Sequence, residues 1–186
     1  MTESIVNLHD HERAARVVMD EAAWAYFSGG AADEITLRRN AAAWQQWALV
    51  PRVLRDLQGG HTRCRLLERE WPLPLLVAPM ALQRGAHPDG EAGMALAAAA
   101  QGAGLVLSHQ TSTPLQDVAR LFVPEPERGP LWFQMYWQAD RGRSTELLRA
   151  VEAAAYEALV LTVDAPVQGV RDRERRHRMR WPEDIT

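Results

Sequence analysis

Four short apolar runs recur at nearly even spacing in the second part of the chain. They are LLVAPM from Leu75, LVLSH from Leu105, LWFQMY from Leu131 and LVLTVD from Leu159, and successive runs start 30, 26 and 28 residues apart. Runs that are apolar at consecutive positions are typical of strands buried on both faces of a sheet. Each interval has room for a helix, and strand–helix repeats of this length predict parallel strands joined by right-handed crossovers. The predicted fold class is therefore α/β.

The intervals between the runs have helical features. The segment DGEAGMALAAAAQGAG begins with acidic residues and ends in glycines, which favours a helix with a stabilised start and a C-terminal stop. Thr113, Pro114 and Gln116 predict a capping-box start, with proline in the first turn, for the next helix. In the third interval, Leu147 and Val151 recur at helical spacing.

The first part of the chain is predicted to be mostly helical. Its apolar spacing indicates helices over His9–Met19, Glu21–Phe27 and Asp33–Leu49, and we expect Pro51 to end the third. The stretch TRCRLLERE from Thr62 predicts a short strand pair.

Composition excludes several kinds of protein. The formal net charge of -3 gives no reason to expect nucleic acid as a partner. All 21 basic residues are arginine, which excludes a catalytic lysine within the chain. A single cysteine, Cys64, permits neither an internal disulfide nor a cysteine-based metal site, and we predict no metal. The first residues lack the apolar core of a signal peptide, and no stretch approaches a membrane span, so we expect a soluble cytoplasmic protein.

Two folds repeat strand and helix in this way, the open doubly wound sheet and the closed TIM (β/α)8 barrel. The first run continues into APMALQRGAHPDGE, which matches neither a dinucleotide-binding fingerprint nor a P-loop. Polar residues where the strands end favour the barrel, whose active sites lie at the carboxyl ends of its strands. We therefore predict that the chain supplies about the first four βα units of a TIM barrel.

The predicted strands all end in groups suited to binding. The first ends in APMALQ, and the later three end in polar pairs: Ser108 with His109, Gln134 with Tyr136, and Thr162 with Asp164. Any one of them is equally well a capped strand end, but together they favour a binding site. Neutral donors and acceptors of this kind suit the edge of a flat heteroaromatic ring better than phosphate or a metal.

Several motifs in this chain resemble the FMN-dependent α-hydroxy acid oxidases and dehydrogenases, the family of glycolate oxidase, lactate oxidase, mandelate dehydrogenase and hydroxymandelate oxidase. The matching motifs, in the family's order, are AYFSGGAADEITLRRN, VPRVLRD, PLPLLVAPMALQRGAHPDGE, LWFQMYW and LTVDAPVQGVRDRE. The QMYW motif is most similar to the mandelate and hydroxymandelate branch. The resemblance implies FMN as cofactor, a small 2-hydroxy acid as substrate, and oxidation of its CH–OH group to the 2-oxo acid.

The resemblance also implies roles for individual residues. Those expected to bind the cofactor are Pro79, Met80 and Ala81 through their backbone, and Ser108, Gln134 and Thr162 through their side chains. Tyr26, Tyr136 and Arg171 match residues that bind the substrate. Tyr136 and Asp164 are the expected catalytic residues, with Asp164 pairing with the family's base histidine. One departure is Gln110, where glycolate oxidase carries a tryptophan.

These roles agree with the chemistry of the residue types. Arginine grips a carboxylate through two parallel hydrogen bonds, which lysine cannot do. Histidine is the side chain best suited to accept a proton near neutral pH, and a carboxylate behind it stabilises the charged imidazolium. We accordingly expect Asp164 at a buried strand end, where a cationic partner offsets the cost of burying its charge.

None of the six histidines of this chain matches the family's base. The resemblance implies that the base histidine, the main substrate arginine and the phosphate-binding loops belong to the second half of the barrel. The organisation we predict is one barrel domain over 1–186, in which 1–71 is a helical segment with the strand pair, and 72–186 holds strands one to four with their helices and the start of the next loop. A full barrel needs about 250 residues, so we expect a second polypeptide or the missing C-terminal half to complete it, and a homo-oligomer of the complete barrel.

Two other interpretations stay open on the sequence alone. One is another FMN barrel enzyme, such as an isomerase or an amide-forming enzyme. Tyr26 and the TVDAP segment argue against it. The other is a truncated half barrel without catalysis that acts as an interaction module.

Overall fold

The computed structural model describes residues 4–164 and 167–177. Among these, one compact unit joins 4–53 to 167–177 and a second comprises 54–164. Each unit is described by itself.

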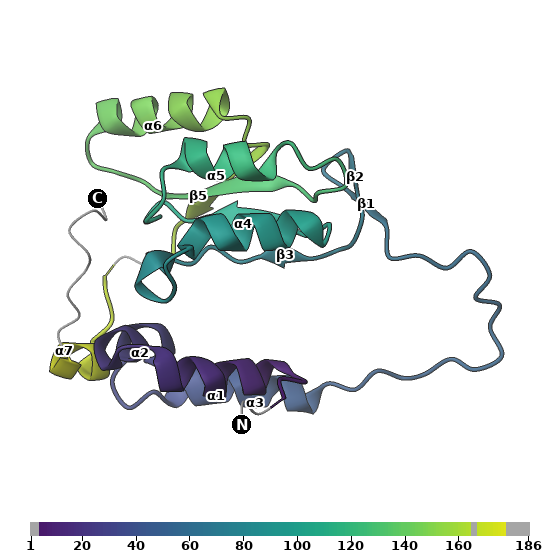
Figure 1. Ribbon diagram of the computed structural model, residues 1–186, viewed down its shortest axis with the longest axis horizontal. Coiled ribbons are helices and arrows are strands. Elements are labelled where there is room, and N and C mark those ends of the chain that lie inside the picture. Colours follow the sequence, from purple (N-terminus) through teal and green to yellow (C-terminus); the bar gives the residue numbers. More distant parts are fainter. Residues whose placement is uncertain (1–3, 165–166, 178–186) are drawn as a thin grey trace. The chain divides into compact units, whose positions relative to one another are not determined.

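The second unit contains a four-stranded sheet with all strands parallel and neighbouring in chain order. The strands are β3 (Leu76–Val77), β4 (Gly104–Leu107), β5 (Leu131–Tyr136) and β6 (Ala158–Thr162). The helices between them are α4 (Gly90–Ala100), α5 (Leu115–Phe122) and α6 (Arg141–Ala153), and a 3-10 turn, Gln83–Gly85, precedes α4. Figure 1 shows α4, α5 and α6 next to one another in chain order. The predicted alternation of strands and helices is confirmed.

One face of this sheet carries the hydrophobic core. The register pairs Leu105 with Leu131 and Leu107 with Phe133, so these four side chains share the face that the helices cover. Each of them is at most 1% exposed. Tyr156 closes the core beside Phe133, with ring centroids 5.7 Å apart, and donates its hydroxyl to the carbonyl of Leu115. Burial of this kind raises the pKa of the Tyr156 phenol.

The other face of the sheet is polar toward the carboxyl ends of the strands and aromatic toward their amino ends. Trp132 lies on this face near the start of β5, and Trp71 packs against it with ring centroids 5.6 Å apart. Trp71 belongs to an antiparallel hairpin of β1 (Cys64–Leu66) and β2 (Arg69–Trp71), which confirms the predicted strand pair. The hairpin therefore covers the amino end of this inner face and leaves the carboxyl end to the polar residues.

The fourth strand departs from the prediction that every run is buried on both sides. Along β6, Leu159 and Leu161 pair with Phe133 and Met135 and thus point to the helix side, yet they are 50% and 49% exposed. β6 is the last element of the second unit, and among residues 54–164 no helix follows it as α4, α5 and α6 follow the preceding strands.

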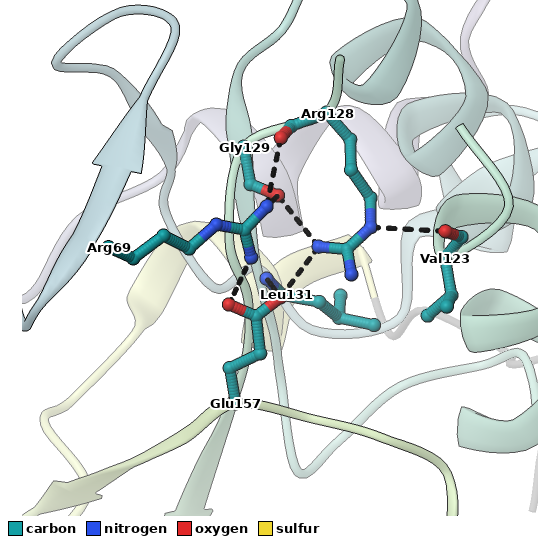
Figure 2. Close-up of polar contacts among 6 residues, drawn as sticks. All are labelled: Arg69, Val123, Arg128, Gly129, Leu131 and Glu157. Carbon is teal, nitrogen blue, oxygen red and sulfur yellow. Dashed lines mark hydrogen bonds and ion pairs between the residues drawn. The ribbon is translucent and has the colours of Figure 1, made fainter. Parts of the chain in front are cut away.

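A third feature of the second unit is a charged cluster where β5 and β6 begin (Figure 2). The carboxylate of Glu157 pairs with Arg69 of the hairpin and with Arg128, whose Nη1 lies 2.6 Å from Glu157 Oε1. Arg69 also donates to the carbonyls of Arg128 and Gly129, at 3.1 and 3.3 Å. Burial alone would raise the pKa of Glu157, but the two guanidinium groups outweigh it and hold the pKa below its ordinary value. The cluster therefore ties the hairpin to the strand starts while Glu157 is ionised.

Replacing Glu157 with Gln removes the charge that both arginines share and is expected to lower the free energy of unfolding by about 1–3 kcal/mol. Because the folded pKa lies below the unfolded value, this stabilisation is present above the ordinary glutamate pKa and is lost as pH falls through the folded value. Urea denaturation at pH 7 and at lower pH measures both effects. Glu152→Gln, at an exposed position of α6, is the control; equal stabilities of the two variants at pH 7 contradict the prediction.

Two of the crossover helices end in the same way. The Gly102 amide bonds to Ala99 and the Ala103 amide to Ala98, a Schellman motif with Gly102 at φ +70°. This confirms the glycine stop predicted for α4. At the end of α6 the equivalent left-handed position is Ala155, at φ +62°, where a Cβ atom costs free energy that glycine avoids.

Ala155→Gly is therefore expected to stabilise the protein by about 0.5–1 kcal/mol and to raise its Tm. The neighbouring Ala154→Gly is the matched control, because Ala154 has φ −89° and gains nothing from glycine. Thermal denaturation that shows Ala155→Gly to be as destabilising as Ala154→Gly goes against this interpretation.

The first unit is helical, as predicted, with one correction. Its helices are α1 (Leu8–Val18), α2 (Glu21–Ser28), α3 (Ile35–Ala43) and α7 (Asp172–His177). A 3-10 turn, Trp44–Gln46, comes directly after α3. The helix predicted over Asp33–Leu49 is too long, and Pro51 does not end it. The apolar spacing that supported it stops at Trp44, and Trp47 is already extended at φ −99° and ψ 139°. Within the described ranges, no helix combines the length and the apolar character needed to cross a membrane.

Candidate functional site

The polar residues predicted to bind the cofactor form one hydrogen-bonded row across three strands. Ser108 Oγ donates to Gln134 Oε1 at 3.3 Å, and Gln134 Nε2 donates to Thr162 Oγ1 at 2.8 Å. The backbone amide of His109 also donates to Gln134 Oε1, at 3.1 Å. Ser108 and Gln134 are 4% and 3% exposed. The structure therefore brings Ser108, Gln134 and Thr162 together on the inner face, at the carboxyl ends of β4, β5 and β6.

The segment after β3 lies beside this row. Pro79 and Met80 are exposed and Ala81 is half-buried. Leu82 takes a left-handed conformation at φ +57°, and its amide donates to the carbonyl of Gln110 at 2.9 Å. The loops after β3 and β4 are thus bonded to each other through their backbones, with Pro79 and Met80 presented to solvent.

Glu91, near the start of α4, connects the loop after β3 to the loop after β4. Its side chain is fully buried and accepts four hydrogen bonds. The donors are the amides of Gln83 at 3.0 Å and Ser112 at 2.8 Å, and the hydroxyls of Ser112 at 2.6 Å and Thr113 at 2.9 Å. Burial would raise the pKa of Glu91, but these hydrogen bonds outweigh it and hold the pKa below its ordinary value. In the described part of the chain no ion pair of Glu91 is found, and neutral donors stabilise its charge.

Sequence reasoning missed this role of Glu91 and treated it only as an acidic residue at a helix start. It also predicted a capping box at Thr113, which is wrong. Pro114 occupies the N-cap of α5 without a side-chain hydrogen bond, and the Thr113 hydroxyl donates to Glu91 instead.

Glu91→Gln replaces an oxygen acceptor with an amide that faces the donors of Ser112 and Thr113. We expect the free energy of unfolding to fall by about 2–3 kcal/mol, because buried donors lose their acceptor. Equilibrium urea denaturation measures it, with Glu146→Gln on the exposed side of α6 as control. An unchanged denaturation midpoint for Glu91→Gln argues against the four-bond arrangement.

Tyr136 lies at the end of β5, on the inner face, and its side chain is 38% exposed. The ring of His109 stacks on the Tyr136 ring, with centroids 6.1 Å apart and planes 27° apart. His109 Nδ1 accepts the amide hydrogen of Tyr136 at 3.1 Å, and Nε2 lies 2.9 Å from the Gln138 side-chain nitrogen. Burial lowers the pKa of His109. Since both ring nitrogens already have partners, His109 is not placed as a free general base.

Asp164 differs from the prediction of a buried strand end, while its pairing with a histidine from the second half of the barrel stays a prediction. Strand β6 ends at Thr162, and Asp164 lies two residues further on in a bend, where it is exposed. Across residues 4–164 and 167–177, no arginine forms an ion pair with it. The expectation of burial is wrong because β6 is the open edge of the described sheet.

The first unit brings together Tyr26 and Arg171, which are 145 residues apart in the chain. The Arg171 guanidinium lies over the Tyr26 ring, 4.8 Å from its centroid, and donates to the Tyr26 carbonyl. Arg171 Nε also forms an ion pair with Glu174, 3.0 Å from Oε2. The structure thus pairs two of the residues predicted to bind the substrate. That Tyr26 shares one cavity with Tyr136 stays a prediction, because it joins residues of the two units.

A second set of contacts in the first unit holds the SGG turn, residues 28–30, at the end of α2. Arg173 bonds to Ser28 and to Glu34, and the amide of Ala32 donates to the carbonyl of Val170 at 2.7 Å. The Gly30 amide, together with Arg173, lowers the pKa of Glu34. The SGG turn is therefore bound to the segment before α7, and this keeps Tyr26 next to Arg171.

Comparisons with known proteins decide the family. The sequence matches the family model described as FMN-dependent dehydrogenase over residues 15–186. This chain belongs to that family. It is 46% identical to an L-lactate oxidase of Alicycliphilus denitrificans over 87% of this chain and 43% of that protein. It is 38% identical to a 4-hydroxymandelate oxidase of Amycolatopsis orientalis over 97% of this chain and 49% of the relative.

Solved structures of family members agree with the sequence. Mandelate oxidase with (S)-2-phenylpropionate superposes on 98% of this chain with a TM-score of 0.90, at 38% identity, and the match covers 53% of the mandelate oxidase chain. The chain thus spans about half the length of the relatives it matches. Its four parallel strands and alternating helices belong to a TIM barrel, which confirms the fold predicted from the four apolar runs.

Proposed function

We propose that this member of the FMN-dependent dehydrogenase family contributes to the oxidation of a small 2-hydroxy acid to the 2-oxo acid, with FMN as the electron acceptor. The observation that carries the proposal is the row of Ser108, Gln134 and Thr162 on the inner face of the sheet. In this proposal the chain supplies one side of the cofactor site and part of the substrate site, and the remainder of a TIM barrel supplies the rest.

The chemistry of the row fits the edge of a flavin ring, which offers carbonyl oxygens, ring nitrogens and an N–H group. Two hydroxyls and one amide can each donate and accept, so they can match such an edge without a charge. Gln134 is held by Ser108 and the His109 amide on one side and by Thr162 on the other, so its amide is oriented before a ligand arrives. FMN, when bound, supplies the acceptor for the electrons and hydrogen of the substrate α-carbon.

The substrate side of the proposal rests on Tyr136, Tyr26 and Arg171. Tyr136 is exposed at the end of β5, next to the polar row, so its hydroxyl is available to a ligand on the inner face. Arg171 is held by its stacking on the Tyr26 ring and its hydrogen bond to the Tyr26 carbonyl. A guanidinium held in this way suits a carboxylate, the group common to all 2-hydroxy acids.

The proposal assigns proton transfer to a residue other than the histidines described here. His109 has both ring nitrogens engaged, and His9, His11, His61, His87 and His177 are exposed. We propose that the base histidine and the main substrate arginine come from the remainder of the barrel, in the same or a second polypeptide, and that Asp164 pairs with that histidine. We also propose that the complete barrel forms a homo-oligomer and that it is located in the cytoplasm.

The decisive experiment purifies this chain together with the segment that completes the barrel and identifies any bound flavin from its absorbance and mass. Anaerobic addition of lactate, mandelate or glycolate is expected to bleach the oxidised flavin band with at least one of them. A colourless protein, or a flavin that none of the three reduces, contradicts the proposal.

Gln134→Leu tests the polar row directly. The substitution removes the amide from the centre of the row, and we expect the Kd for FMN to rise about tenfold to hundredfold, the loss of one or two hydrogen bonds. Fluorescence titration of the apoprotein with FMN measures the Kd. Gln116→Leu, at an exposed position of α5, is the matched control and should bind FMN as the unsubstituted protein does.

A further inference from the structure

His109 makes an organised set of contacts that the proposed chemistry does not use. It follows Ser108 directly, and its ring contacts Phe133 and Tyr136, with centroid distances of 6.2 and 6.1 Å. Strand β4 ends at Leu107, so its backbone pairs with β5 only as far as Phe133. Beyond that point the His109 side chain replaces a backbone partner from β4, because its Nδ1 accepts the hydrogen bond from the Tyr136 amide.

The contacts determine which nitrogen of His109 carries a proton. An amide N–H can donate only to a ring nitrogen without one, so Nδ1 is bare. In the neutral ring the proton is then on Nε2, which lies 2.9 Å from the Gln138 amide. Because a protonated Nε2 needs an acceptor, the Gln138 side-chain amide must present its oxygen to Nε2. Burial, which lowers the pKa of His109, favours the same neutral ring.

We infer that His109 is a positioning residue for Tyr136. Its Nδ1 holds the backbone amide of Tyr136 at the end of β5, and its ring orients the phenol ring by stacking. The inference rests on the proposed function, in which the Tyr136 hydroxyl lies beside the substrate. The side chain of Tyr136 is 38% exposed and stands at the end of its strand, so packing alone leaves its orientation open. His109 fixes both the backbone and the ring of Tyr136.

Two substitutions separate the hydrogen bond from the volume of the side chain. His109→Asn places an amide oxygen close to the position of Nδ1 and keeps an acceptor for Tyr136. His109→Leu keeps an apolar side chain against Phe133 but has no acceptor. Both variants retain the His109 backbone amide that donates to Gln134, so neither should alter the Kd for FMN.

In the FMN-loaded enzyme with its complete barrel, we expect His109→Leu to lower kcat/KM for the 2-hydroxy acid about tenfold, and His109→Asn, which restores the acceptor but not the stacked ring, to recover part of it. The same substitutions in a Tyr136→Phe background should have little further effect, because His109 acts through Tyr136. Equal rates for His109→Leu and the unsubstituted enzyme, equal rates for the Leu and Asn variants, or additive effects with Tyr136→Phe each overturn the inference.

A second measurement does not depend on turnover. Nitrogen NMR of the FMN-loaded protein with ¹⁵N-labelled histidine identifies the His109 signals as those lost in His109→Asn. The expected spectrum has an unprotonated Nδ1 and a protonated Nε2, and a proton on Nδ1 overturns the inference whatever the rates of the variants. If instead the unsubstituted protein binds FMN but no 2-hydroxy acid reduces it, the proposed function fails while the tautomer is still measured.

Discussion

The parallel register of β4, β5 and β6 is the constraint on which the rest of the second unit depends. Side chains alternate between the two faces of a strand, so the pairing of Leu107 with Phe133 puts Ser108 and Gln134 together on the opposite face. The same pairing continues to Thr162 through β6. One register therefore builds the core under the helices and the polar row on the inner face, and a shift by one residue would destroy both.

Two carboxylates hold the opposite ends of this sheet. Glu91 collects donors from the loops at the carboxyl ends of the strands, and Glu157 joins the hairpin to the amino ends. Both have a lowered pKa, although Glu91 relies on neutral donors and Glu157 on two arginines. The loops that carry the site and the hairpin that covers the inner face thus both depend on ionised glutamates, and protonation of each glutamate in acid weakens its own end of the sheet.

The features predicted correctly from the sequence are those that local pattern determines. The four apolar runs, the helices between them, the glycine stop at Gly102 and the strand pair before Pro72 all depend on residues close together in the chain. Two of the errors arise where a distant partner decides. Thr113 failed as a cap because Glu91 takes its hydroxyl, and Asp164 is exposed because the strand that carries it is an open edge.

The polar row and His109 show that the two parts of the proposed chemistry, binding the flavin ring and accepting a proton, need different side chains. Binding a flat ring edge needs neutral groups fixed in place, and Ser108, Gln134 and Thr162 already satisfy one another, so the row is formed before any ligand binds. Accepting a proton needs a nitrogen with a free lone pair, and His109 has committed its own to the Tyr136 amide. His109 is therefore poorly placed to act as the base, in agreement with the proposal that the base comes from the remainder of the barrel.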